Sequence, residues 1–174
     1  MDKKGITLVE LLAALVLFGI VAALVSTILT TIIRANKDIQ ISTQANSEGN
    51  YLITVLENEF NKFELTDEPT SCGTNCLLLL SSERYILDGD LIVLDSTDQT
   101  LQIAFSSNQM QLVKIENGIT VINQSYPISY FAIGPQTSIQ WTSTTERFRI
   151  QFTIELIDEN GKSYVYLASH IYNR

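Results

Sequence analysis

The chain has 174 residues, with 11 Lys+Arg against 19 Asp+Glu and a formal net charge of −8. This length allows one domain with an appendage, and 45% hydrophobic content excludes a disordered chain. The net acidity argues against a nucleic-acid-binding surface, because phosphate neutralisation requires clustered basic side chains. The mean hydropathy of +0.15 is high for a soluble domain, so the position of the hydrophobic residues matters.

The hydrophobic residues are concentrated near the N-terminus. Residues 11–33, the apolar run, are 23 consecutive residues without a charge, and 18 of them are apolar. A helix of this length covers about 34 Å, enough for a hydrocarbon core of about 30 Å. The Ser and Thr residues of the run are compatible with a span, because their hydroxyls can bond to the preceding helical turn. We expect the apolar run to cross a membrane.

The charges on either side of the apolar run suggest its orientation. Lys3 and Lys4 precede it, whereas the chain from Arg34 onward has 9 basic against 17 acidic residues and no second apolar stretch of that length. By the positive-inside rule, the N-terminus is expected in the cytoplasm and the remainder outside, as an exported domain on one anchor.

The apolar run has three ordinary explanations. A cleaved secretory signal has an apolar stretch of about 7–15 residues, which is shorter than this one. A buried core helix would need a domain of 141 residues to surround it on all sides, which is geometrically awkward. A plain signal anchor stays open, but it does not explain Glu10, since a carboxylate at the edge of a span costs free energy and by default has a partner and a function.

The order of residues around Glu10 gives a more specific reading. A short basic leader ends at Gly5, a hydrophobic residue follows at Ile6, and Glu10 is the fifth residue after the glycine. This arrangement resembles the class III signal of the type IV pilin and pseudopilin family. The resemblance implies that a prepilin peptidase cuts between Gly5 and Ile6 and N-methylates Ile6. It divides the chain into a leader (1–5), a transmembrane and filament-core half of the first helix (6–33) and an exported globular domain (34–174).

The cut would give Glu10 a partner. Removal of the leader creates an α-amino cation on Ile6, and Glu10 of one subunit could neutralise that cation on a neighbour among apolar helices, where an unpaired charge is very costly. This pairing would set the axial register of a subunit in a filament. Glu10 is therefore the expected assembly residue.

The helix is expected to continue to about Phe63. Apolar residues recur at spacings of three, four and seven, at Ile41, Ala45, Leu52, Val55, Leu56, Phe60 and Phe63. This stripe should pack on the globular domain, and the helix should stop before the turn at 66–69. Gly19 and Gly49 are expected weak points, each costing about 1 kcal/mol relative to alanine.

Downstream, the period of the apolar residues changes from helical to alternating. Residues 148–156 alternate strictly, the turn sequence at 158–161 follows, and 162–172 alternate again, which predicts a long C-terminal hairpin. Further strands are expected at 76–80, 84–87, 90–94, 100–105, 109–116 and 128–133, with turns at 88–89, 96–98 and 117–118. The expected fold is α+β: a type IV pilin-like lollipop, with a long N-terminal helix packed on an antiparallel sheet arranged as a meander.

The two cysteines, Cys72 and Cys76, bracket a predicted loop. Outside the membrane, thiols this close would oxidise to each other, although two free thiols stay open as the alternative. Zinc is disfavoured, because two sulfurs fill only half of a tetrahedral site.

Catalytic chemistry finds little support, and we expect neither an enzyme nor a cofactor. The lone His170 lies on a predicted strand and is read as structural. A calcium site was considered at Asp88, Asp90, Asp95 and Asp98, but their spacing fits no EF-hand loop, and aspartate is ordinary in turns.

The resemblance implies a minor pilin, a structural subunit of a type IV pilus or related filament. The helix-to-sheet pattern also resembles J-type minor pseudopilins and their counterparts in competence pili. The implied partners are prepilin peptidase, other pilin subunits and, indirectly, the assembly platform protein with its ATPase; the membrane holds the subunit before assembly, and no nucleic acid is expected to bind. Two alternatives stay open, a pseudopilin of a type II secretion system and a non-polymerising, membrane-anchored adhesin.

Overall fold

The computed structural model describes residues 7–73, 75–82, 84–88, 91–95, 98–144 and 147–173, with the backbone alone for 84–88 and 91–95. Over these residues the chain forms a helix, α1 (Leu8–Lys62), followed by eleven strands. Contacts divide the chain into two compact units, residues 1–42 and residues 43–174. We call them the helical unit and the sheet unit and describe each by itself.

The long helix predicted from the sequence is confirmed. It ends at Lys62, one residue before the expected end at Phe63, whose N–H is shared between the carbonyls of Glu59 and Phe60 at 3.1 and 3.2 Å. Within the sheet unit the helix buries one face, formed by Ala45, Gly49, Leu52, Leu56 and Phe60. This face contains Ala45, Leu52, Leu56 and Phe60 of the stripe predicted from the spacing. Ile41 and Val55 are half-buried, and Phe63 is buried just beyond the end of the helix.

The strands form three antiparallel sheets. The first has five strands in the order β1-β2-β5-β6-β7, and the second pairs β3 with β4. In the third, β10 pairs with β11 over its whole length and with β8 and β9 along its other edge. The strand bounds are β1 (Thr70–Gly73), β2 (Cys76–Ser81), β3 (Arg84–Asp88), β4 (Leu91–Asp95), β5 (Gln99–Ser106), β6 (Gln109–Glu116), β7 (Ile119–Pro127), β8 (Ala132–Ile133), β9 (Ser138–Ser143), β10 (Arg147–Ile157) and β11 (Ser163–Asn173).

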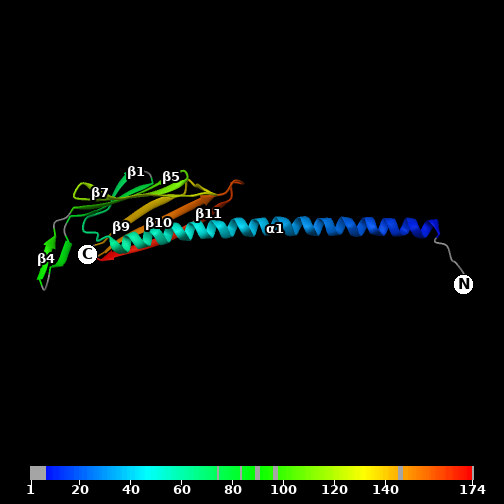
Figure 1. The fold of residues 1–174 in the computed structure, drawn as a ribbon, viewed down its shortest axis with the longest axis horizontal. Coiled ribbons are helices and arrows are strands. Elements are labelled where there is room, and N and C mark those ends of the chain that lie inside the picture. Colours follow the sequence, from blue (N-terminus) through cyan, green and yellow to red (C-terminus); the bar gives the residue numbers. More distant parts are fainter. Residues whose placement is uncertain are drawn as a thin grey trace. The chain divides into compact units, whose positions relative to one another are not determined.

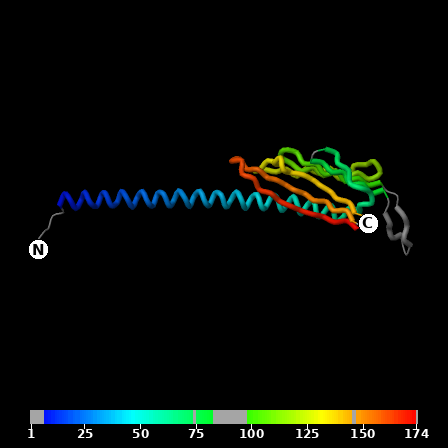
Figure 2. Tube along the Cα trace, turned by 180° about the vertical axis from the view of Figure 1, so that it is seen from behind, coloured from blue at the N-terminus to red at the C-terminus, as the bar shows by residue number. Residues whose placement is uncertain are grey.

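The end of α1 lies beside the strands β10 and β11, as both Figure 1 and Figure 2 show. The ring of Phe60 stacks on Phe152 of β10 at a centroid distance of 5.1 Å. The hydroxyl of Tyr172, on β11, donates to the carbonyl oxygen of Phe60 at 3.1 Å. Burial raises the pKa of the Tyr172 phenol above its usual range. The apolar inner face of β10 and β11 and the stripe of α1 therefore share one core.

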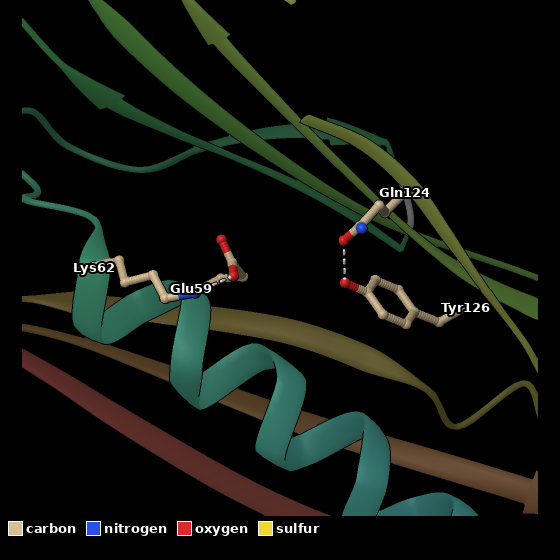
Figure 3. Close-up of polar contacts among 4 residues, drawn as sticks. All are labelled: Glu59, Lys62, Gln124 and Tyr126. Atoms are coloured by element: carbon tan, nitrogen blue, oxygen red, sulfur yellow. Dashed lines mark hydrogen bonds and ion pairs between the residues drawn. The ribbon is translucent and has the colours of Figure 1, made fainter. Parts of the chain in front are cut away.

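The same helix also faces the five-stranded sheet. Tyr51 packs edge-on against Tyr126 of β7, with ring centroids 6.2 Å apart. Burial and the nearby Glu59 carboxylate raise the pKa of Tyr126, whose hydroxyl donates to Gln124 Oε1 at 2.6 Å. Figure 3 shows this bond beside the ion pair of Glu59 with Lys62, whose Oε1 and Nζ lie 2.9 Å apart.

The strand prediction was right for most of the alternating segments and wrong elsewhere. The hairpin β10–β11 and its turn at 158–161 are confirmed, as is the turn at 117–118, where Asn117 and Gly118 have φ of 49° and 77°. The strand expected at 128–133 is wrong, because only Ala132–Ile133 pairs. The simple meander is also wrong, because the β3–β4 hairpin interrupts the five-stranded sheet. The strands β1, β7 and β9 were not predicted, and the turn positions Gly89, Ser96 and Thr97 lie outside the described residues.

Apart from the two-residue strand β8, the segment 128–137 is not a strand, and the Glu155 carboxylate holds its C-terminal part in another conformation. Ile128 and Phe131 are buried like core residues. The buried Glu155 carboxylate accepts the Gln136 N–H at 2.8 Å and the Ser163 hydroxyl at 2.6 Å. Gly134 lies directly against this carboxylate, since a Cβ at residue 134 would overlap it.

Candidate processing and assembly site

The N-terminus of α1 begins with a reciprocal capping arrangement. The backbone N–H and the hydroxyl of Thr7 both donate to Glu10 Oε2, at 3.0 and 3.1 Å, and the Glu10 N–H donates to the Thr7 hydroxyl at 3.3 Å. This is a capping box, in which a threonine and a glutamate three residues later satisfy N–H groups that the first turn leaves unpaired. Sequence reasoning missed Thr7, although the Thr-x-x-Glu spacing before an apolar run is the signal that finds it.

The capping box leaves part of the carboxylate unused. Both bonds to the carboxylate end on Oε2, and Oε1 accepts none from the residues that the structure describes. The glutamate is exposed in this single chain. Glu10 can therefore cap its own helix and still accept a hydrogen bond on Oε1 from a group on another chain.

The expected cleavage position adjoins this cap, but it lies outside the described residues. Gly5 and Ile6 belong to residues 1–6, so their geometry is not part of the structure. The described chain begins at Thr7, which the cut would leave as the second residue. The proposed boundary between leader and helix thus rests on sequence alone.

The apolar run forms an exposed helical surface. The most hydrophobic 18-residue window of α1 has a mean hydropathy of 2.8, and none of it is buried within the chain. Large side chains along it are more than half exposed, including Leu15 at 64%, Phe18 at 73% and Leu24 at 60%. By length and composition this helix can cross a membrane, and it fits a single-pass anchor.

Three of the four hydroxyl groups within the apolar run are satisfied by the helix itself. Thr27, Thr30 and Thr31 each donate to the carbonyl oxygen four residues earlier, at 2.9, 2.7 and 2.9 Å. These bonds follow the pattern expected from the sequence. These three hydroxyls therefore do not need water or a neighbouring chain.

The other residues singled out in the sequence lie far along the chain from Glu10. Cys72 and Cys76 are bonded to each other across the β1–β2 turn, with Cα atoms 5.1 Å apart. The ring of His170 stacks on Phe60 at 5.5 Å and meets Tyr172 at 4.6 Å. Burial lowers the pKa of His170, and the charge of Glu57 opposes that shift. This histidine is packed among aromatic rings on the helix-facing side of β11.

The considered calcium site is only partly visible. Asp90 lies outside the described residues, the side chains of Asp88 and Asp95 are also undescribed, and Asp98 is exposed. Across the part of the chain that the structure describes, no three His, Cys, Asp or Glu side chains gather in a way that could hold a metal ion.

Comparison with known proteins finds a match to the N-terminal segment that contains the Thr7–Glu10 capping box. The family description "prokaryotic N-terminal methylation motif" matches residues 1–26, which include Gly5, Ile6, Glu10 and the first part of the apolar run. No curated protein and no solved structure matches the chain significantly. The motif belongs to a structural, non-enzymatic family whose signal is read by prepilin peptidase. The chain thus carries at residues 1–26 the class III signal of type IV pilins, and this signal leads into a long helix followed by an antiparallel sheet domain.

Proposed function

We propose that this chain is a minor pilin, a structural subunit that is cut between Gly5 and Ile6, methylated on Ile6 and assembled into a type IV filament through its N-terminal helix. The observation that carries the proposal is the position of Glu10. It is an acidic side chain in the first turn of α1, immediately before an exposed apolar surface and inside the methylation motif. In an anchor that stays in the membrane, this carboxylate would serve only to cap its own helix, and Oε1 would have no further role.

The charge balance of assembly supports this role for Glu10. Cutting after Gly5 removes two lysines and one aspartate and creates one α-amino cation on Ile6. Packed among apolar helices, that cation needs an anionic partner, because an uncompensated buried charge costs several kcal/mol, on the order of 3–5. Glu10 Oε1 has no hydrogen bond to the described residues and can serve that cation on a neighbouring subunit.

The remaining features of the proposal follow from the same segment. The short N-terminus faces the cytoplasm, where prepilin peptidase acts, and residues 34–174 are exported. Its partners are other pilin subunits, with the platform protein and its ATPase acting indirectly. The exposed apolar run holds the subunit in the membrane before assembly and contacts neighbouring helices afterwards.

Two alternatives predict different results. A pseudopilin of a type II secretion system would share the processing and the helix contacts, and only its co-expressed machinery would differ. A membrane-anchored adhesin would keep its N-terminus and remain monomeric. Measurements of processing and of incorporation into filaments therefore test the adhesin alternative directly.

The decisive experiment is co-expression of the full chain with a prepilin peptidase, followed by intact mass measurement. We expect loss of residues 1–5 and addition of one methyl group at Ile6. A Gly5→Leu variant should remain uncut, because glycine leaves the backbone at the scissile bond unobstructed. An unaltered Met1 terminus on the membrane-inserted wild-type chain would contradict the proposal.

A further inference from the structure

The outer edge of β11 is an unprotected strand edge. Over its whole length, Ser163 to Asn173, this strand pairs on one side with β10 in eleven consecutive positions without a register shift. No described strand pairs with its other side. The edge therefore presents a row of backbone N–H and C=O groups that a further strand could use.

The other edges of the two larger sheets are formed by shorter or irregular strands, and the opposite edge of the β11 sheet consists of β8, with two residues, and β9, with six. The edge strand β7 has a register irregularity opposite Lys114 and Ile115, and it ends in Pro127, which cannot donate a ladder hydrogen bond. The edge strand β1 has four residues and its own register shift. In contrast, β11 contains eleven residues and neither proline nor a charged side chain. The usual devices that prevent strand addition are missing from this edge alone among the edges of the two larger sheets.

The outward face of β11 also carries an apolar row. Val165, Leu167 and Ile171 are exposed by 48%, 76% and 44%. Beside this row, Gln140, Gln151, Thr153, Leu167 and Ser169 line a shallow depression of about 240 Å³ together with parts of Phe152 and Ala168. A strand added to the edge would place alternate apolar side chains next to the row, and cross-strand pairs of this kind stabilise a sheet.

Two cations give the row a direction. Arg149 lies opposite Ile171 and Arg147 opposite Asn173 in the β10–β11 register, and both are exposed on the same outward face. No ion pair joins either of them to a carboxylate among the described residues. Glu155, the acid on the same side of β10, is buried and already accepts bonds from Gln136 and Ser163. The Ile171 end of the row is therefore positively charged.

We propose that the free edge of β11 receives an extended strand from another protein chain, with apolar residues at alternate positions and an acidic residue opposite Ile171. Strands lie about 4.8 Å apart, so the acidic residue would stand about 10 Å from Arg149 at the Cα positions. The side chains of an arginine and a glutamate are together long enough to meet over Ile171 at that Cα separation. Backbone hydrogen bonds supply affinity, and the apolar row with Arg149 supplies specificity.

A second copy of β11 fits this edge less well. Its sequence from Ser163 to Asn173 contains no carboxylate, so pairing of two copies would leave both Arg149 side chains without a counter-charge. An acidic strand of a different chain supplies that charge. The inference goes beyond filament assembly through the N-terminal helix and does not depend on processing at Gly5.

The test uses the full chain in detergent micelles and synthetic eleven-residue peptides with blocked ends. The probes alternate Val and Thr and carry one Glu, either third or ninth in the peptide, because the edge accepts a strand in either direction. Control peptides replace Glu by Lys or place Pro at the centre. Fluorescence anisotropy measures affinity, and hydrogen exchange measures protection of the β11 amides.

We expect one of the two Glu peptides to bind and to slow exchange of the β11 amides at least tenfold, and the Pro peptide to bind at least tenfold more weakly. Leu167→Lys should weaken binding at least tenfold, whereas Ile119→Lys, on the equally exposed β7 edge, should not. The double variant Arg147→Gln, Arg149→Gln should abolish the preference for Glu over Lys, and Arg149→Gln alone should reduce it.

Three results would overturn the proposal. The first is failure of both Glu peptides to bind at millimolar concentration. The second is binding that Ile119→Lys abolishes and Leu167→Lys leaves unchanged. The third is self-association of the full chain through β11, which a Leu167→Cys variant would reveal as a disulfide-linked dimer without peptide.

Discussion

The ring of Tyr166, on β11, lies against the backbone of Gly49 on α1, so closely that a Cβ at residue 49 would come within 2.6 Å of the ring carbons. The Tyr166 hydroxyl donates to Asn46 Oδ1, one turn earlier on the helix, at 3.0 Å. The Tyr166 side chain is thereby held on the helix by two contacts, its ring carbons against Gly49 and its hydroxyl on Asn46. Gly49, which the sequence presents as a weak point of the helix, is a close-packing position.

Gly49→Ala should destabilise the sheet unit. The gain in helix propensity is about 1 kcal/mol, but overpacking against a held ring costs about 1–3 kcal/mol, so we expect a net loss of up to about 2 kcal/mol in the free energy of unfolding. Urea denaturation followed by the fluorescence of Trp141, the only tryptophan, measures it. Gly19→Ala is the matched control, since no atom lies within 4 Å of a Cβ there. Equal stability of the two variants would contradict the packing argument.

The pair Thr7→Ala and Glu10→Gln separates helix capping from charge pairing. Glutamine can replace glutamate in a capping box, so Glu10→Gln keeps the cap and removes only the charge. Thr7→Ala keeps the charge and removes the cap. If charge pairing with Ile6 drives assembly, Glu10→Gln should lower incorporation into filaments at least tenfold, and Thr7→Ala much less.

Immunoblotting of sheared filaments against membrane fractions measures both variants. The opposite order, with Thr7→Ala as the more harmful change, would assign the effect to helix capping.

Loss of the Cys72–Cys76 disulfide should have a small and local effect. The bond closes a short loop at an exposed edge strand, and loop-closure entropy for so short a ring amounts to about 2 kcal/mol at most. The Cys72→Ser, Cys76→Ser double variant should therefore keep a folded core and lose about 1–2 kcal/mol. Non-reducing mass spectrometry of the exported wild-type chain checks that the bond forms. Two free thiols in that chain would contradict the disulfide and therefore the predicted effect of its loss.

Removal of the Glu155 side chain should destabilise the chain strongly. In Glu155→Ala, the Gln136 N–H and the Ser163 hydroxyl lose their buried acceptor, which costs about 2–4 kcal/mol in the free energy of unfolding. Glu159→Ala, in the exposed turn of the same hairpin, serves as the control. Urea denaturation of both variants gives the comparison, and a loss below about 1 kcal/mol for Glu155→Ala would contradict this assignment.

His170 should make the fold less stable in acid. Burial lowers its pKa in the folded chain, whereas the unfolded chain has the ordinary value of about 6.5. Below that value the unfolded state binds the proton more readily, so stability falls as the pH drops from about 6.5 through the folded pKa. His170→Gln should flatten this part of the curve. Urea midpoints between pH 7 and pH 5 measure the effect, and an unchanged slope would exclude His170 as its source.

The sequence predicts those parts of the fold whose residues repeat with a clear period. The stripe from Ala45 to Phe60 and the alternation along β10 each bury one face, so their pattern reports their environment directly. The strand β7 has mostly exposed side chains on both faces, and no alternation marks it. In segment 128–137, the apolar residues Ile128 and Phe131 are buried, so the sequence resembles that of a strand. The conformation depends on contacts with Glu155, which is distant in sequence.

The candidate site divides in the same way. Glu10 stands out in sequence because it adjoins an uncharged run, and Thr7 could have been found from its spacing to Glu10. The close approach of Tyr166 to Gly49 could not be found, because it joins residues 117 positions apart in sequence. No local pattern encodes such a contact.

The hydroxyls of Thr27, Thr30 and Thr31 bond within their own helix, so most polar groups of the apolar run have partners within the run itself. A segment of this kind presents nearly the same surface to lipid chains and to the side chains of other helices. Its transfer from one surrounding to the other exchanges dispersion contacts and breaks no polar bond. The preference for helices over lipid must then come from the shape of the helix surface and from the Glu10 carboxylate at the N-terminal end of the run. Along most of the helix, transfer between lipid and a bundle of helices is therefore reversible in principle.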